Sequence, residues 1–209
     1  DGPGPLDTKA LTLFSSTLTD SDPEVRANTL KVIGDCKARS LSQKGALDAS
    51  LKDPEARVRF FAALAIGQTG AKESLPAVLE MVRENADQDQ YLRHAAVMAL
   101  SLNNDKDLLG LGLTDPSQHV RLVTLLAMAR TNDPRISGFL KDQAPQLVTE
   151  AAWNITHGTS KAAQADLAKL VGQDGLAEPV ELQTLNAAFR TGGDEPAAAI
   201  SAFAAQSTK

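Results

Sequence analysis

Apolar residues recur with helical spacing along most of the chain, in runs separated by short polar breaks. Five longer runs, rich in Ala and Leu, end near Gly34, Gly67, Leu100, Arg130 and Ile155. Four shorter amphipathic stretches lie before or between them, at 6–18, 41–51, 75–82 and 108–113. The strict apolar–polar alternation of a half-buried strand is missing. The pattern therefore predicts pairs of helices, with the shorter helix first, and no sheet.

An arginine stands at the same place near the start of four of the longer runs. Arg26, Arg59, Arg93 and Arg121 follow one another at intervals of 33, 34 and 28 residues, and Val148 takes this place in the fifth run. Periods of this length are typical of solenoids of helix pairs. With three later stretches, at 162–171, 180–190 and 195–205, we expect six pairs and a final helix. The predicted fold is an all-α, right-handed α-α superhelix forming one domain over 6–206, between a leader (1–5) and a tail (207–209).

The breaks carry the residues that begin and end helices. Asp-Pro occurs at 22–23, 53–54, 115–116 and 133–134, each time before a helical pattern. Aspartate is a good N-cap, and proline is favoured at the first helical position. Gly34, Gly67 and Gly70 stand where helices are expected to end.

The motif Asp-Pro-x-x-x-Val-Arg, followed by an Ala-rich helix and a glycine, resembles HEAT repeats; residues 53–67 are a good copy. The resemblance implies a ladder in which aspartates and arginines join neighbouring repeats. Its members here are Asp22, Arg26, Asp53, Arg59, Arg93, Asp115 and Arg121. The ladder should weaken at the fifth repeat, which has no arginine. The other interpretation of these arginines is a site for an anion.

A second set of positions lies on the face of the longer helices that is turned away from the shorter ones. Aligned on the arginine, this face carries Phe60, Leu64, His94, Met98, Leu122, Leu126 and Trp153. Polar residues are expected on a solvent-facing row, so we predict an apolar stripe that binds a partner. If the alignment is off by one residue, or a loop covers the row, these side chains belong to the core instead.

Composition narrows the function. The net charge of −5 and the pI of about 5.2 argue against nucleic acid as a partner, because phosphate contacts need clustered Lys and Arg. No apolar run is long enough to span a membrane. A lone cysteine, Cys36, excludes an internal disulfide and a Cys-x-x-Cys zinc or haem motif. The three histidines lack metal-ligand spacing, so we expect no cofactor, no metal and no catalytic residue.

Three stretches, at 91–100, 150–155 and 185–193, resemble the helical-repeat segment of large bacterial proteins of the membrane-bound-dehydrogenase-like or c-type haem-binding kind. In those proteins a β-propeller precedes the repeats and a cytochrome module follows them. The resemblance implies a periplasmic or extracellular segment of a longer chain. We therefore expect a non-catalytic scaffold that binds protein, either an adjacent domain of the same polypeptide or another chain.

Two enzyme classes remain as alternatives. The first is a bilin-lyase-like HEAT protein that holds a ligand in its concave groove. The second is a DNA-lesion glycosylase of HEAT architecture, which the acidic charge disfavours because such an enzyme needs a basic groove.

Overall fold

The computed structural model describes residues 14–38 and 44–207, which form two compact units that divide between Leu109 and Gly110. The expected leader, most of the stretch 6–18, the start of 41–51 and the last two residues of the tail lie outside the described residues. The expectation of one continuous domain over 6–206 stays a prediction.

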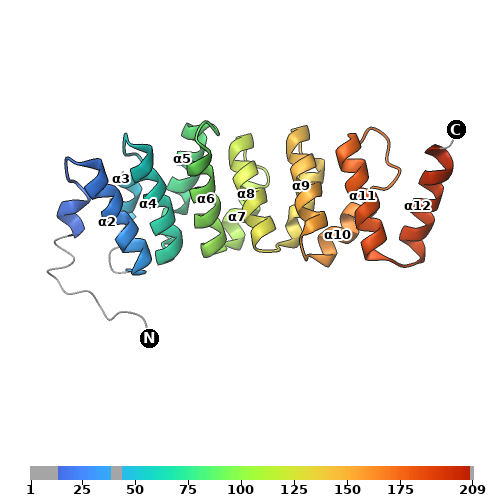
Figure 1. Cartoon of the computed structure of the whole chain (residues 1–209), viewed down its shortest axis with the longest axis horizontal. Coiled ribbons are helices and arrows are strands. Elements are labelled where there is room, and N and C mark those ends of the chain that lie inside the picture. Colours follow the sequence, from blue (N-terminus) through green and yellow to red (C-terminus); the bar gives the residue numbers. More distant parts are fainter. Residues whose placement is uncertain (1–13, 39–43, 208–209) are drawn as a thin grey trace. The chain divides into compact units, whose positions relative to one another are not determined.

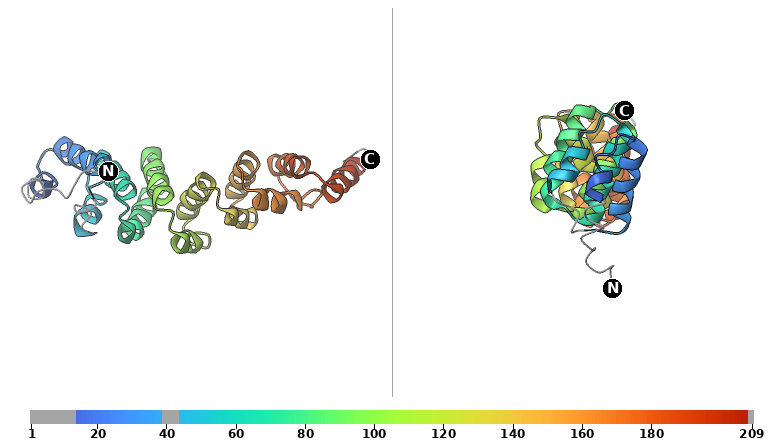
Figure 2. Two further views of the ribbon diagram at one scale, coloured as in Figure 1. Left: turned by 90° about the horizontal axis from the view of Figure 1, so that it is seen from below. Right: turned by 90° about the vertical axis from the view of Figure 1, so that its left-hand side faces the viewer.

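The first unit is a row of long helices with shorter helices packed on one side (Figure 1). After a helical turn at 14–17, its elements are α2 (Pro23–Asp35), α3 (Lys44–Ser50), α4 (Ala56–Thr69), η2 (Lys72–Ser74), α5 (Leu75–Asn85) and α6 (Gln90–Asn103). α4 packs between α2 and α6, while α3 packs on α4 and α5 packs on α6. Figure 2 shows α3 and α5 on one side of the row formed by α2, α4 and α6.

Helix α7 (Lys106–Gly112) contains the two boundary residues. The second unit, like the first, consists of long helices with shorter helical elements packed on them. Its elements are α8 (Gln118–Arg130), η3 (Pro134–Lys141), α9 (Pro145–His157), α10 (Lys161–Ala168), α11 (Glu178–Thr191) and α12 (Asp194–Ser207). α9 contacts both α8 and α11, η3 and α10 pack against them, and α12 packs on α11.

The predicted all-α class is confirmed, since the described residues contain helices and turns but no strand. Each long apolar run forms a long helix whose inner face is fully buried, as at Leu30, Ile66, Leu100 and Met128. Small side chains, among them Ala62, fill the space between neighbouring helices. One short element differs in type: Asp133-Pro134 opens a 3-10 helix, η3, rather than an α-helix.

The Asp-Pro pairs do not all cap helices as expected. Asp22 does cap α2, because its carboxylate accepts the N–H of Glu24 and Pro23 is the first helical residue. Asp53 and Asp115 instead lie two residues before the cap and accept the N–H groups of Glu55 and Ser117. There the aspartate closes a turn that leads into the helix, and the prediction that it is the cap itself is wrong.

Two of the three expected helix-ending glycines lie inside helices. Gly70 does end α4, in the left-handed region at φ 75°. A Cβ on Gly67, however, would lie 3.0 Å from the Cα of Ala99, and a Cβ on Gly34 would lie 3.3 Å from the Cα of Ala65. These glycines allow α2, α4 and α6 to pack closely, so their role is contact between helices rather than termination.

Candidate functional site

The outward side of α4 carries the first part of the predicted stripe. Phe60 and Leu64 are half-buried, whereas the next positions toward the core, Ala62 and Ala63, are fully buried. Phe61 meets Phe60 edge to face with ring centroids 5.1 Å apart, and the guanidinium of Arg57 lies 5.2 Å from the centre of the Phe61 ring. These contacts hold the aromatic side chains in place on a surface that remains accessible.

The outward side of α6 is more exposed than that of α4. His94 is exposed and Met98 is half-buried, as the stripe requires. The same side carries Tyr91, which is 76% exposed, and Leu102, which is 53% exposed. The sequence interpretation missed both, although they stand three residues before His94 and four after Met98, on one helical face.

The α4–α6 face consists of Phe60, Leu64, Tyr91, His94, Met98 and Leu102. None of these side chains is fully buried. In the first unit these side chains therefore lie outside the fully buried core, and the binding of a partner by this row stays a prediction.

The second unit has a corresponding surface on α8 and α9. Leu122 and Leu126 are half-buried beside the buried Val123, and Trp153 is 54% exposed. The ring of His157 lies 4.0 Å from that of Trp153, measured between centroids, and its Nδ1 donates to the Trp153 carbonyl oxygen at 2.8 Å. This hydrogen bond fixes the imidazole against the indole. Leu122, Leu126, Trp153 and His157 form the α8–α9 face.

Arg26 makes the contact between repeats that the ladder requires. Its Nε and Nη2 donate to the two carboxylate oxygens of Asp53 at 2.8 and 2.9 Å. Burial alone would raise the pKa of Asp53, but the hydrogen bonds from Arg26 and from the Glu55 N–H outweigh it and hold this pKa below its ordinary value. The hydrogen bond to Asp53 likewise raises the pKa of Arg26.

Arg121 repeats this geometry in the second unit with a partner that the sequence interpretation did not name. Its Nε and Nη2 donate to the carboxylate of Asp142 at 2.7 and 3.1 Å. Asp142 occupies the turn before α9 in the way that Asp53 occupies the turn before α4. The aspartate of the fifth repeat is therefore present although its arginine is replaced by Val148.

The other arginines differ from the expected ladder. Arg59 donates to the main-chain oxygens of Asp53 and Pro54, at 2.7 and 2.9 Å, within its own turn. Arg93 binds both carboxylate oxygens of Asp87, six residues before it, at 2.8 and 2.7 Å. The expected link to a following repeat is wrong for Arg59, because the aspartate at the required place is engaged by Arg93.

The remaining ladder aspartates, Asp22 and Asp115, each accept a main-chain N–H at the start of a helix. Asp22 caps α2, and Asp20 takes the position that corresponds to Asp53, since its carboxylate accepts the N–H of Asp22 at 2.8 Å. Asp115 accepts the Ser117 N–H, and its carbonyl oxygen receives Nη1 of Arg121 at 2.8 Å.

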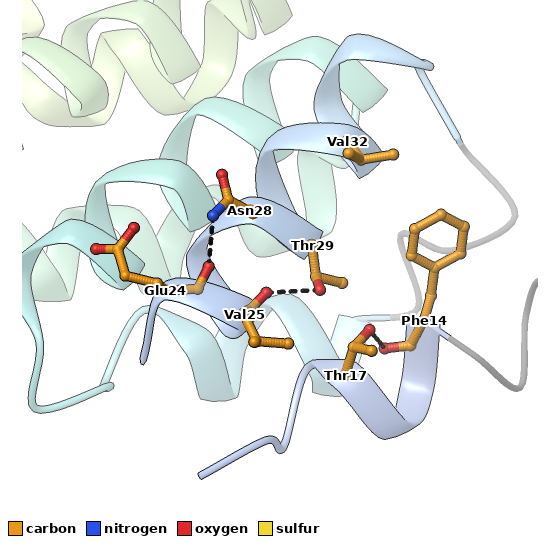
Figure 3. Close-up of a pocket in the computed structure, with 7 residues that line it drawn as sticks. All are labelled: Phe14, Thr17, Glu24, Val25, Asn28, Thr29 and Val32. Atoms are coloured by element: carbon orange, nitrogen blue, oxygen red, sulfur yellow. Dashed lines mark hydrogen bonds between the residues drawn. The ribbon is translucent and has the colours of Figure 1, made fainter. Parts of the chain in front are cut away.

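Several hollows open on the described surface. One, of about 420 Å³, lies between the turn at 14–17 and α2; Figure 3 shows Phe14 and Thr17 facing Val25, Thr29 and Val32 across it. Among the described residues no group of three or more His, Cys, Asp or Glu side chains is placed to hold a metal ion. No described helix is both long and apolar enough to cross a bilayer.

Comparison with known proteins agrees with this architecture. The family profile for HEAT repeats matches residues 11–101. A comparison with curated protein sequences gives no match. Residues 11–101 are thus similar to HEAT repeats, and the further resemblance to dehydrogenase-like or haem-binding proteins finds no counterpart here.

Solved structures with a similar arrangement include natural and designed proteins. The complex of CpcE and CpcF of phycocyanin lyase from Nostoc sp. PCC7120 is 18% identical, with a TM-score of 0.48, and the match covers 97% of this chain and 96% of that chain. A designed armadillo repeat protein, YIII(Dq)4CqI, is 17% identical, with a TM-score of 0.41, and the match covers 87% of this chain and 100% of that chain. A related design in complex with the peptide (KR)4 is 18% identical, with a TM-score of 0.41 and coverage of 87% and 99%.

Proposed function

We propose that the chain is a non-catalytic scaffold whose HEAT-like repeats bind another protein through the outward faces of their long helices. The observation that carries this proposal is the side of α6 on which Tyr91 and Leu102 are more than half exposed beside Met98. Isolated exposed apolar side chains are common, but a contiguous set is typical of an interaction site. Tyr and Met are also enriched in protein interfaces.

The α8–α9 face supports the same function independently of the first unit. Trp153 is held by its stack with His157 while more than half of its surface remains open to solvent. A fixed aromatic side chain loses little conformational entropy on binding, and Trp is the residue type most enriched among binding hot spots. Leu122 and Leu126 add half-buried apolar side chains from α8, which packs against α9.

The natural context belongs to this proposal as well. We infer from the sequence resemblance that the repeats form one segment of a larger exported bacterial protein, with its partner either a neighbouring domain or a separate chain. The adjoining gene sequence tests this directly. A propeller-type domain upstream and a Cys-x-x-Cys-His motif downstream are expected, and flanking sequence with neither feature contradicts the context while leaving the scaffold function open to its own test.

Affinity capture with matched variants tests the scaffold function. Tyr91→Asp, Leu126→Asp and Trp153→Ala each alter an outward face, whereas Lys72→Glu alters an exposed residue of η2 that belongs to neither face. A protein retained by the wild type and by Lys72→Glu, and lost from at least one face variant with an unchanged melting temperature, supports the function. A protein retained equally by all four chains contradicts it. Unfolding of Leu126→Asp would show that Leu126 is needed in the core.

A further inference from the structure

Arg26 and Arg121 donate hydrogen bonds from all three guanidinium nitrogens, and they do so in the same way. In Arg26 and Arg121, Nη1 donates to the carbonyl oxygens six and five residues earlier, at 2.7 and 3.2 Å and at 2.8 and 3.3 Å. The Nε–Nη2 edge then faces outward to the next repeat and takes both oxygens of Asp53 or Asp142. A guanidinium edge bound to a carboxylate in this bidentate form is a strong and directional contact.

Arg59 makes the same Nη1 contacts with main-chain oxygens but lacks the contact of Nε and Nη2 with a carboxylate. Its Nη1 donates to Asp53 and Pro54, six and five residues earlier, as in the other two arginines. Among the described residues, no side chain or carbonyl oxygen accepts a hydrogen bond from its Nε or Nη2. The side chain is half-buried and held at one end, so the free edge is already fixed in the conformation that binds a carboxylate elsewhere in the chain.

The reason lies in the turn before α6. At Asp20, Asp53, Asp115 and Asp142, the carboxylate accepts the N–H two residues later, at 2.8 to 3.0 Å. Before α6 the corresponding N–H, that of Asp89, is taken by Oδ1 of Asn85 at 3.1 Å. Ala86 and Asp87 adopt left-handed conformations, with φ of 44° and 62°. Asp87 is thereby released from the turn and pairs with Arg93 instead of Arg59.

A cavity of about 300 Å³ opens where the missing carboxylate would lie. Arg59 and Lys52 line it from one repeat, and Glu84, Asn85 and Gln88 line it from the next. Asp53 also borders the cavity; its two carboxylate oxygens are paired with Arg26, although the charge of Arg59 acts on it as well. With the Arg26–Asp53 pair set aside, the other formal charges of the lining are two positive, on Arg59 and Lys52, and one negative, on Glu84. Gln88 adds a polar side chain to the lining, whereas the Asn85 amide is already engaged with the main chain of Asp89.

We propose that this cavity binds a carboxylate, held by Nε and Nη2 of Arg59 in place of the absent ladder aspartate. The chemistry fits an Asp or Glu side chain of a protein segment or a free small carboxylate. The cavity lies at the turns between repeats, apart from the α4–α6 face, so this site does not rest on the proposed function.

Titration followed by NMR of the arginine Nε–Hε signals tests the site. The probes are acetate and the peptide acetyl-Asp-Pro-Glu-Ala-amide, which copies residues 53–56, where Asp53 meets Arg26. The peptide acetyl-Asn-Pro-Gln-Ala-amide is the uncharged control, and loss of one signal in Arg59→Lys assigns Arg59. We expect a saturable shift of the Arg59 signal with both acidic probes and none at Arg26, which is already engaged.

The outcomes separate the two sources of the carboxylate. Tenfold tighter binding of the acidic peptide than of acetate points to a protein segment, and equal affinities point to a free carboxylate. The proposal is overturned if the Arg59 signal does not saturate, if the uncharged peptide shifts it equally, or if the exposed Arg57 responds in the same way.

A second variant tests the structural origin of the site. Asn85→Ala removes the acceptor of the Asp89 N–H, so Asp87 is expected to close its own turn again and to bind Arg59. The affinity for the acidic peptide should then fall at least tenfold while the melting curve stays cooperative. An unchanged affinity in a folded Asn85→Ala variant contradicts the explanation.

Discussion

Arg121 and Asp142 form a bidentate ion pair that is almost completely shielded from water. The Nε–Oδ2 and Nη2–Oδ1 distances are 2.7 and 3.1 Å, and the two side chains are only 5% and 4% exposed. The pair joins the start of α8 to the turn that precedes α9, so it fixes one repeat on the next. A contact of this kind stabilises the stack because either partner left alone would be a buried, uncompensated charge.

Arg121→Ala is expected to lower the free energy of unfolding by about 3–5 kcal/mol, the usual effect of removing one partner of a buried pair. Arg57→Ala is the matched control: its ion pair with Glu24 is more than half exposed and contributes only about 0–1 kcal/mol, and its cation–π contact with Phe61 adds only about 0.5–1 kcal/mol at such an exposed place. Chemical denaturation of both variants checks this. Equal losses would contradict a structural role for Arg121.

Arg93→Ala should also lower the melting temperature, since the partly buried contact with Asp87 holds the left-handed turn before α6. Arg135 is not a neutral control for this experiment, although its position near a loop suggests one. It binds Asp133, which is almost fully buried at the start of η3, at 3.0 and 2.8 Å. Arg57→Ala is again the better comparison, and a melting temperature of Arg93→Ala equal to that of Arg57→Ala would remove the structural interpretation.

Asp53 makes the stability of the first unit depend on pH in the acid range. Its pKa in the folded chain is below the ordinary value of 3.8, so the unfolded chain binds more protons as the pH approaches that value. The stabilisation is complete above the unfolded pKa and is lost as the pH falls through the folded one. Asp53→Asn should therefore differ most from the wild type near neutral pH, and the difference should shrink on acidification.

Unfolding free energies measured from neutral pH down to about pH 3 check the behaviour of Asp53. Asp174→Asn, at an exposed residue between α10 and α11, is the matched control for loss of a carboxylate. A constant difference between Asp53→Asn and the wild type over the whole range would show that the carboxylate is not the source of the stability.

Gly67→Ala and Gly45→Ala should change stability in opposite senses. Both variants replace a helical glycine by alanine, and this replacement favours the helix by up to about 1 kcal/mol. A Cβ at position 45 meets nothing within 4 Å, whereas at position 67 it lies 3.0 Å from the Cα of Ala99 and 3.2 Å from Leu102. Overpacking of this kind costs about 1–3 kcal/mol. A melting temperature of Gly67→Ala equal to or above that of Gly45→Ala would contradict the close contact of α4 with α6.

The repeat pattern predicts the helices well because burial of one helical face leaves a clear period in the sequence. It assigns Gly67 to a helix end because a glycine that ends a helix and one that admits a neighbouring helix look alike in a single sequence. Alignment on the arginines selects Phe60 and Met98, which are half-buried, and their role in binding a partner stays a prediction. Tyr91 stands at the start of the run. The predicted start of a helix is uncertain by about one turn, so the sequence does not show which face Tyr91 occupies.

The ladder could be predicted only where each turn has the same hydrogen bond, from an N–H group to the aspartate two residues before it. The sequence places an aspartate six residues before Arg59 and Arg93 alike. Whether Asp87 pairs with one or the other depends on the side chain of Asn85, which competes for a single N–H group. That competition is decided by the three-dimensional conformation of the turn, and no spacing in the sequence reveals it.

Trp153 offers a direct readout of the α8–α9 face, because it is the only tryptophan of the chain. We expect its fluorescence to be readily quenched by acrylamide in the folded protein, and His157→Ala to increase the accessibility further by removing the stacked ring. A bound partner at this face should shift the emission to the blue and protect it. Fluorescence that already resists acrylamide in the free chain would contradict the exposure of Trp153.

Site-specific photocrosslinking tests most directly whether the α4–α6 face binds a protein. A benzoylphenylalanine at position 98, in the middle of that face, should crosslink to a discrete protein partner in cells that express the chain. The same group at position 72, on η2, should not crosslink to that partner. Tyr91→Asp should abolish the crosslink from position 98 without lowering the melting temperature. Identical crosslinks from both positions, or a crosslink that survives Tyr91→Asp, would contradict the proposed scaffold surface.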